Sequence, residues 1–379
     1  WMQDGVVYGL FNRQGGPRGG REGVVPNWWM SMLTREQGRH RVGVNAMFSL
    51  DPATVGRRGY GEIFQVGETL DGQPLVDRQH PHDFFMQLSA SWQVTAGSTA
   101  VVVAGGPVGE PTLGPIAFMH RASAADLPPA PLGHHTFDST HVSFGVVAAS
   151  VDRGRWTVEG SVFNGREPDE HRWDLDLGRM DSIAARVWFR PRSGWEAQVS
   201  TGRLRDPEVL EPGDAERTTT SLSWFRSGHA GFAAATVGYG VNAAHGVRRH
   251  GGFAEFTVER DGNGVFGRVE AQQVETSALL GDHAPGSNDG HLGESVVTAA
   301  TIGASKRLVT WRGFDGALGG DVTLYAVPHD LVETHGRRPV SAQAYFRLRL
   351  PDRGMGRMWG MRMMRATHAD AMGGGHTMP

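Results

Sequence analysis

Apolar and polar side chains alternate along most of the chain, whereas the spacing typical of amphipathic helices is scarce. In residues 41–50 every second side chain is apolar, from Val42 to Leu50, and residues 182–190 and 341–350 show the same pattern. Successive side chains of a β-strand point to opposite faces of a sheet, so each segment is predicted to be a strand with one apolar and one polar face.

The alternation predicts about sixteen antiparallel strands, each of about ten residues. They span residues 4–13, 25–34, 38–50, 83–95, 98–106, 139–151, 154–165, 181–191, 194–204, 216–226, 230–241, 250–260, 263–275, 295–308, 314–327 and 339–350.

The predicted connections alternate in length. Tight turns are expected at 95–98, 152–155, 192–194 and 261–264, and long loops at 51–82, 107–138, 166–180, 205–215, 276–294 and 328–338. Short periplasmic turns and long extracellular loops are typical of outer-membrane β-barrels, whereas a soluble β-sandwich gives no reason for loop length to alternate. We therefore predict an all-β transmembrane barrel over residues 1–350, located in the outer membrane and in contact with its lipid, followed by a tail over 351–379.

The alternation also predicts which side chains face lipid and which face the lumen. The lipid-facing set comprises Val44, Ala46, Phe48, Val187, Phe189, Phe346 and Leu348, and the lumen-facing set Arg186, Glu159, Glu270 and Arg347. In the lumen, Arg186, Arg268 and Arg347 are expected to pair with carboxylates from Glu159, Glu196, Glu255 and Glu270. Aromatic residues near strand ends fit an interfacial girdle: Trp28, Trp92, Trp156, Trp195, Trp224 and Phe346.

Composition narrows the chemistry. The net charge of −3 offers no basic face for nucleic acid. The chain has no cysteine, which excludes disulfides, thiolate metal sites and cysteine nucleophiles. No segment reaches the roughly 18–20 apolar residues that a membrane-spanning helix needs.

The long loops are rich in histidine, carboxylates and arginine. Imidazole and carboxylate together suit divalent first-row metals, and the candidate ligands are His80, His82, His134 and His135. Around them we expect a network in the lumen and loops that includes Asp77, Arg78, Asp83, His120, Arg121, Asp138, His141, Glu159, Arg166 and Glu167. The alternative is a purely structural salt-bridge network that narrows the pore, with Asp77–Arg78 and Arg166–Glu167 as partners.

The tail concentrates methionine and histidine. Its candidate ligands are Met358, Met361, Met363, Met364, His368 and His376. Thioether sulfur is a soft ligand that selects Cu(I), so the tail is a candidate copper-collecting segment. The alternatives are a plug that packs its methionines in the lumen, or a terminus without a role.

One short motif raises the possibility of an enzyme. His141 and Ser143 lie two residues apart, an arrangement that resembles the catalytic motif of outer-membrane phospholipase A. Phe144 stands where that motif has asparagine, and Val142, Phe144 and Val146 are the side chains expected on the lipid side. A lipase is therefore disfavoured, and we assign no catalytic residue.

Several longer segments resemble an uncharacterised bacterial family whose members are often encoded near copper and heavy-metal resistance systems. The resemblance is carried by residues 67–83, which include the run Asp77-Arg78-Gln79-His80-Pro81-His82-Asp83, and by 114–121, 131–135 and 163–170. It implies a metal context and names no catalytic residue.

Three functional hypotheses follow. The first is a porin-like barrel that handles or transports a metal ion, copper first, with Cu(I) at the tail and Cu(II) or Zn(II) at the loop histidines. The second is a structural barrel with a loop-plugged lumen that binds other envelope or metal-efflux proteins. The third is an enzyme on the lumenal face. The sequence leaves the transported ion and the oligomeric state open.

Overall fold

One closed antiparallel sheet forms the molecule. The computed structural model describes residues 1–280 and 293–350. In this part of the chain, the 17-stranded main sheet consists of the short β2 (Arg21–Val24) and sixteen long strands. These are β1 (Met2–Arg13), β3 (Asn27–Gln37), β4 (His40–Phe48), β9 (Phe85–Ala96), β10 (Thr99–Gly109), β11 (Ser143–Arg153), β12 (Trp156–Phe163), β13 (Ser182–Phe189), β14 (Trp195–Leu204), β15 (Ala215–Gly228), β16 (Gly231–Ala244), β17 (Val247–Arg260), β18 (Asn263–Glu275), β19 (Glu294–Trp311), β20 (Phe314–Ala326) and β21 (Val340–Arg349).

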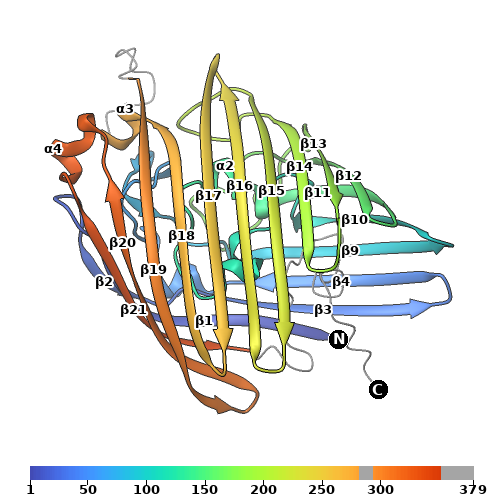
Figure 1. Cartoon of the computed structure of the whole chain (residues 1–379). Coiled ribbons are helices and arrows are strands. Elements are labelled where there is room, and N and C mark those ends of the chain that lie inside the picture. Colours follow the sequence, from blue (N-terminus) through green and yellow to red (C-terminus); the bar gives the residue numbers. More distant parts are fainter. Residues whose placement is uncertain (281–292, 351–379) are drawn as a thin grey trace.

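The sheet closes through its first and last strands. Each long strand pairs antiparallel with its neighbours in chain order, and β1 pairs with both β3 and β21. The closing ladder runs from Val6 opposite Arg349 to Arg13 opposite Ala342. The result is a barrel with all its long strands in sequence order (Figure 1). The predicted sixteen-stranded transmembrane barrel is confirmed, and no helix among the described residues is long and apolar enough to cross a membrane.

Tight turns join the strands at one end of the barrel. Several of them place a glycine at positive φ, as at Gly38, Gly97 and Gly154 (φ 59° each), a conformation that glycine adopts without a Cβ clash. Long loops occupy the other end, with one exception. The connection between β16 and β17 is a two-residue turn, His245-Gly246, so the strict alternation of short and long connections fails there.

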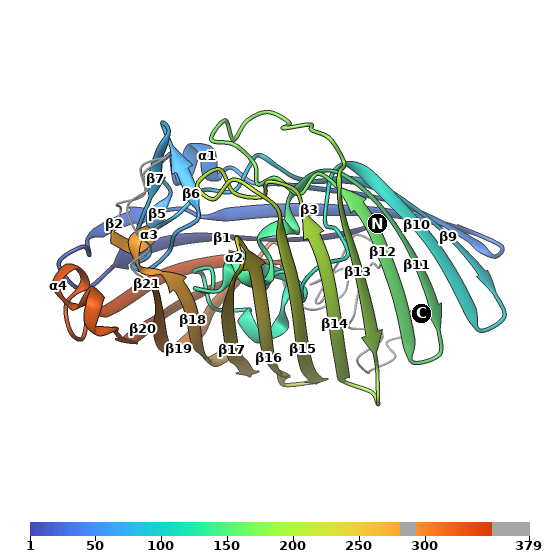
Figure 2. The same cartoon turned by 90° about the horizontal axis from the view of Figure 1, so that it is seen from above.

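Several of the long loops contain short elements, and α2 of one of them lies inside the ring of strands (Figure 2). The loop between β4 and β9 contains α1 (Asp51–Thr54), β5 (Tyr60–Gly61), β6 (Glu68–Leu70), β7 (Gln73–Leu75) and β8 (Arg78–Gln79). The loop between β10 and β11, called the plug loop below (residues 110–142), contains η1 (Phe118–His120), η2 (Ala122–Ala124), α2 (His134–Phe137) and η3 (Ser139–His141). The remaining short helices are α3 (Thr276–Leu280), η4 (His329–Leu331) and α4 (Val332–His335).

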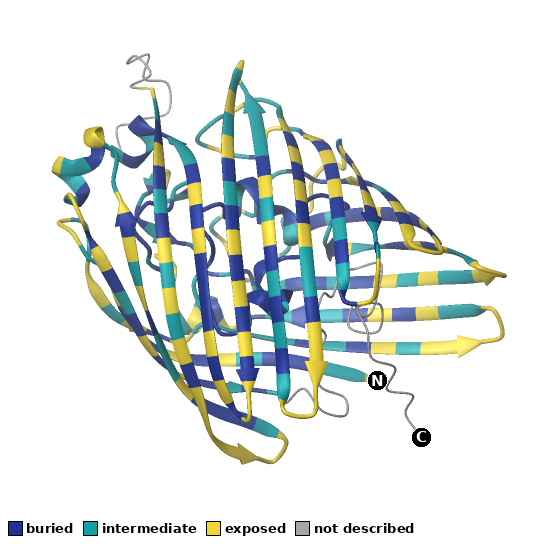
Figure 3. Ribbon diagram, in the orientation of Figure 1, coloured by how far each residue is buried: buried dark blue, intermediate teal, exposed yellow. Residues whose placement is uncertain are grey.

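Exposure alternates along the strands as the sequence predicts (Figure 3). Val44 and Phe346 are 50% and 43% exposed, whereas Arg186 and Glu159 are only 1% and 3% exposed. The other predicted members follow their sets: Val187 is exposed, Ala46, Phe48, Phe189 and Leu348 are half-buried, and Glu270 and Arg347 are buried. The outer face is therefore the apolar, lipid-facing one.

Two predicted orientations are wrong. Val142, Phe144 and Val146 are buried, and Val147, Ala149 and Val151 carry the exposed face of β11. Because both faces of this strand are apolar or small, the alternation could not fix its register. Trp28 is not part of an outer aromatic girdle either, since it packs against a buried cluster inside the barrel, whereas Trp92 and Trp156 are half exposed.

The plug loop is fixed to the barrel wall by apolar and ionic contacts. Ala124 and Leu127 pack with Tyr8, Phe266 and Tyr345 of the wall. The predicted ion pairs between Arg186 and Glu159 (Nε–Oε2 2.8 Å) and between Arg268 and Glu255 (Nε–Oε2 3.0 Å) are present. Arg347 pairs instead with Asp126 of the plug loop, and Arg121 of the same loop joins Glu255. The wall charges thus also hold the plug loop, which the sequence did not predict.

Candidate metal centre

Three chain segments bring histidines together inside the barrel. His80 and His82 follow β8, His134 and His135 begin α2, and His141 ends η3. His134 is 1% exposed and none of the others is an exposed residue. His80, His82, His134 and His135 therefore lie together, and His141 joins them.

Four of the rings form a closed circuit. The ring centroids of His80 and His82 lie 6.4 Å apart, those of His82 and His141 5.7 Å, those of His141 and His134 5.4 Å, and those of His134 and His80 6.1 Å. His135 adjoins the circuit, with its centroid 5.5 Å from that of His134. We call these five residues the histidine cluster.

Each ring in the cluster uses Nδ1 in a hydrogen bond with a carboxylate or a backbone carbonyl. The partners are Asp51 for His82 (2.8 Å), Asp138 for His134 (2.8 Å), Glu167 for His135 (2.9 Å), the carbonyl of Pro81 for His80 (3.0 Å) and the carbonyl of Asp138 for His141 (2.7 Å). Such a bond orients an imidazole and leaves Nε2 as the nitrogen that can bind a metal, the arrangement found around metal-ligating histidines. Nε2 of His141 is buried without a hydrogen-bond partner.

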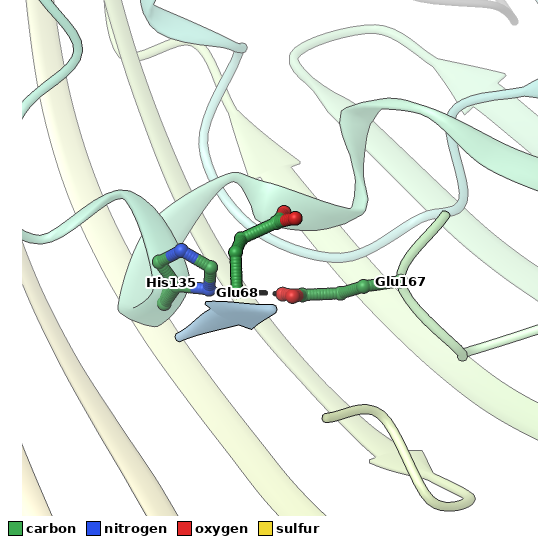
Figure 4. A group of neighbouring side chains, drawn as sticks. All are labelled: Glu68, His135 and Glu167. Atoms are coloured by element: carbon green, nitrogen blue, oxygen red, sulfur yellow. Dashed lines mark hydrogen bonds and ion pairs between the residues drawn. The ribbon is translucent and has the colours of Figure 1, made fainter. Parts of the chain in front are cut away.

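A mixed carboxylate and imidazole group lies beside the circuit. Ligand atoms of Glu68, His135 and Glu167 lie within 4.8 Å of one another, and their side chains converge from β6, α2 and the loop after β12 (Figure 4). Glu68 also contacts His80, with Oε1 3.1 Å from Nε2, and so links the two groups. Glu208 Oε1 lies 3.9 Å from Nδ1 of His135.

Gly67 makes the close approach of His135 to β6 feasible. A Cβ built at Gly67 would lie 2.7 Å from Cε1 of His135, and the glycine has φ 122°, a conformation that side chains rarely adopt. A residue with a side chain at this position would therefore push the imidazole away from Glu68.

Burial keeps most of the cluster neutral. It lowers the pKa of His80 well below its usual value, with the nearby Arg172 guanidinium adding to the effect. Burial also lowers the pKa of His141 to about 3 and lowers that of His134, although the Asp138 carboxylate opposes the shift at His134. Neutral imidazole is the form that binds a metal, so these rings need no deprotonation at neutral pH.

The pKa of His135 is shifted in the opposite direction. Burial opposes its charged form, but the Glu167 carboxylate outweighs burial and raises the pKa of His135 to about 9. Burial raises the pKa of Glu68 to about 7 against the pull of Arg172, and burial together with the Glu167 charge raises that of Glu208 to about 7. A metal at this group would take the place of the proton on His135.

Asp138, which lies on the plug-loop side of the histidine cluster, has further charged and polar partners. Asp138 accepts from Nη1 of Arg121 (2.9 Å) and from the backbone N–H of Phe118 (2.9 Å), in addition to His134. Burial raises the pKa of Asp138, but the hydrogen bond from His134 and the Arg121 charge outweigh burial and hold it well below its usual range. Asp138 therefore remains an anion that fixes the orientation of His134.

The other predicted network residues lie at various distances from the cluster. Asp77 pairs with Arg18 and His335, and Arg78 with Glu22, so the expected Asp77–Arg78 pair is wrong. Arg166 pairs with Asp181, and Glu167 belongs to His135 rather than to Arg166. Asp83 pairs with Arg172, and His120 packs edge-on against Trp28. Ser143 donates to the carbonyl of Thr140, and its neighbour His141 bonds to Asp138, so the two do not form the pair that a lipase would need.

The sequence did not single out Asp51, Glu68, Arg172 and Glu208 as members of the site. Glu68 lies inside the segment 67–83 that carries the family resemblance, and Arg172 lies just after 163–170, whereas Asp51 and Glu208 stand in ordinary loop sequence. Their roles depend on which loops meet in the folded barrel, and the spacing of residues along the sequence does not indicate which loops meet. The tail ligands Met358, Met361, Met363, Met364, His368 and His376 lie outside the described residues.

Comparison with known proteins supports the fold. OprB of Pseudomonas putida, solved at high pH, is similar over 92% of this chain and 93% of its own, with a TM-score of 0.54 and 9% identity. OmpT of Vibrio cholerae in a loop-deleted form (TM-score 0.48, 8% identity, 91% and 99% covered) and OmpF of Salmonella typhi in complex with daunomycin (0.48, 9%, 91% and 96%) are more distant. The chain is an outer-membrane β-barrel that shares the fold of OprB. No protein-family profile and no curated sequence matches it.

Proposed function

We propose that this barrel binds a divalent transition-metal ion in its lumen, copper first, at the histidine cluster and the adjoining Glu68–His135–Glu167 group. One observation carries the proposal: five imidazoles from three chain segments meet inside the barrel, each with Nδ1 held by a carboxylate or carbonyl. Side chains that served only to fill the lumen would not need this common orientation.

The donor set argues for a borderline metal. Imidazole with carboxylate suits Cu(II) and Zn(II), and Cu(II) binds nitrogen and oxygen donors more tightly than the other divalent first-row ions. A site built for Mg²⁺ or Ca²⁺ would offer oxygen ligands alone. The resemblance of residues 67–83 to a family associated with copper resistance supports the same ion, and we propose Cu(I) for the tail.

The test is metal retention by the purified, full-length protein. Wild type and a triple variant, His80→Asn, His134→Asn and His141→Asn, are loaded with Cu(II) or Zn(II), passed through gel filtration and analysed for metal. A matched control replaces His171 and His329, whose side chains are 71% and 102% exposed and lie outside the cluster. We expect the triple variant to lose retained metal and the control to keep it; equal retention by all three proteins would refute the proposal.

A second candidate is a structural barrel that binds other envelope proteins. It is favoured by the filling of the lumen, because Ile63, Phe64 and Leu132 of two loops pack with Val297 and Tyr325 of the wall. Such a barrel would show little ion conductance and would bind no metal in the assay above. Conductance alone does not separate the two candidates, since a metal site can lie in a closed lumen, so metal retention decides.

A further inference from the structure

Methionine is distributed unevenly in the described part of the chain. Of the 14 methionines, seven lie at positions 1–350, namely 2, 30, 32, 47, 86, 119 and 180. Met30, Met32, Met47 and Met86 form one buried cluster, each no more than 3% exposed, and Met2 and Met119 pack against it. Met180, 47% exposed, is the only described methionine outside this group.

The methionine cluster is assembled from five elements. Met2 comes from β1, Met30 and Met32 from β3, Met47 from β4, Met86 from β9, and Met119 from η1 of the plug loop. Within the ladders, Met2 stands opposite Met32, and Met30 opposite Met47. Sulfur side chains are thus paired across the wall rather than spread along it.

These thioethers pack mainly among apolar side chains, and the buried Asp4 stands opposite Met30 in the ladder between β1 and β3. The other members of the cluster are Val108, Val142 and Phe144, with Trp28, Phe85 and Leu175 packed against them. A divalent ion would lose its water here and gain little anionic charge besides that of Asp4, which is costly. A monovalent soft ion fits this environment better, because thioether sulfur selects Cu(I) and the ions that resemble it.

The methionine cluster adjoins the histidine cluster. A cavity of about 60 Å³ touches both clusters, because its lining includes His82, Met119 and Trp28. His120 also lines this cavity, and its ring centroid lies 5.1 Å from that of Trp28. Burial lowers the pKa of His120 to about 4, so its imidazole is neutral at physiological pH. Neutral imidazole and a thioether therefore line the same small cavity.

Packing alone accounts poorly for this choice of residue. Leucine, valine and phenylalanine fill cores with better-defined rotamers, and the other clusters of this barrel use them together with alanine and tyrosine. In those clusters no methionine is present among the described residues. We infer that the methionine cluster is a second metal site in the barrel, one that binds a monovalent soft ion such as Cu(I) or Ag(I) through thioether sulfur.

The test uses Ag(I), a redox-stable ion with the same preference for soft ligands. Full-length protein labelled with ¹³C at the methionine methyl groups is titrated with Ag(I) and followed by NMR. Single Met→Leu variants at 30, 47, 86 and 180 assign the signals, because leucine keeps the volume and removes the sulfur. We expect the signals of Met30, Met47 and Met86 to shift and that of Met180 to stay in place.

Binding should also weaken in a predictable way. The double variant Met30→Leu and Met47→Leu is expected to reduce Ag(I) affinity at the barrel site at least tenfold, whereas Met180→Leu leaves it unchanged. Stationary signals at Met30, Met47 and Met86, with the tail methyls shifting, would overturn the inference. Retention of Cu(II) or Zn(II) by the histidine cluster is measured separately, so either site can fail without the other.

Discussion

Among single residues, His135 differs from His80, His134 and His141 by keeping its proton. Glu167 lies 2.9 Å from its Nδ1 and outweighs the effect of burial, so the pKa is raised to about 9. Because the folded-state pKa lies above the unfolded value, this pair stabilises the fold fully below pH about 6.5, and the contribution is lost as pH rises through about 9. Metal binding should remove the same proton.

We therefore predict that Zn(II) binding near pH 7.5 releases about one proton from His135 in addition to any released by metal-bound water. Calorimetric titration in two buffers with different ionisation enthalpies measures the number released. In His135→Asn this proton should be missing, while His171→Asn should behave as wild type. Equal proton release by all three proteins would show that His135 is not a ligand.

The pair between Arg186 and Glu159 gives a second prediction at this scale. Both side chains are 1% exposed, and the guanidinium also lies over the ring of Trp188, 4.9 Å from its centroid. Replacing Arg186 by methionine removes the guanidinium from the buried Glu159, which keeps the hydrogen bond from Nε1 of Trp188, so the free energy of unfolding should fall by about 3–5 kcal/mol.

Equilibrium unfolding in urea, in detergent micelles, measures this loss. The control is Arg260→Met, which removes an arginine from an exposed pair with Asp261, 3.6 Å away. Exposed ion pairs contribute little, so the control should unfold almost as wild type does. A loss at Arg186 no larger than that of the control would indicate that the lumen around this pair is water-filled.

Among the elements, the position of α2 in the plug loop depends on a glycine in the barrel wall. A Cβ at Gly240 of β16 would lie 2.9 Å from Cε1 of Phe137 and from Cγ2 of Thr136, both in α2. Because α2 also contains His134 and His135, its packing against Gly240 of the wall positions two members of the histidine cluster.

Gly240→Val should displace α2 while leaving the barrel closed. We expect a rise in single-channel conductance in planar bilayers and a lower affinity for divalent metal in the same preparation. Gly252→Val is the control, because a Cβ there meets only a backbone oxygen at 3.7 Å. Unchanged conductance and metal affinity in Gly240→Val would show that the position of α2 does not depend on packing against Gly240.

The strand β11 shows where sequence patterns lose their power. In a strand such as β13, the charged Arg186 on one face and the apolar side chains on the other determine the orientation, whereas residues 142–151 are apolar or small on both faces. Spin labels at Val147→Cys and Val151→Cys should be accessible to oxygen in the bilayer and protected from a water-soluble nickel complex. The reverse pattern would restore the orientation predicted from the sequence, and His229→Cys in a tight turn provides the water-exposed control.

At the scale of the whole molecule, the barrel could be predicted from the sequence and the site only in part. Strand alternation and turn chemistry are local properties, so all sixteen long strands could be predicted from the sequence. The tight turn at His245-Gly246 was not predicted. The site depends on which loops meet inside the closed sheet. The density of histidine in the loops indicates the candidate ligands, whereas Asp51, Glu68 and Glu208 join the site only through tertiary contacts.

In the proposed site, imidazoles inside the barrel bind the metal. X-ray absorption spectroscopy of full-length protein loaded with substoichiometric Cu(II) tests this directly, since imidazole ligands give characteristic outer-shell scattering. We predict a nitrogen and oxygen first shell with several imidazoles, which are lost in the triple variant His80→Asn, His134→Asn and His141→Asn but kept in the control at His171 and His329. A spectrum without imidazole scattering, or one that the triple variant leaves unchanged, would contradict the proposed site.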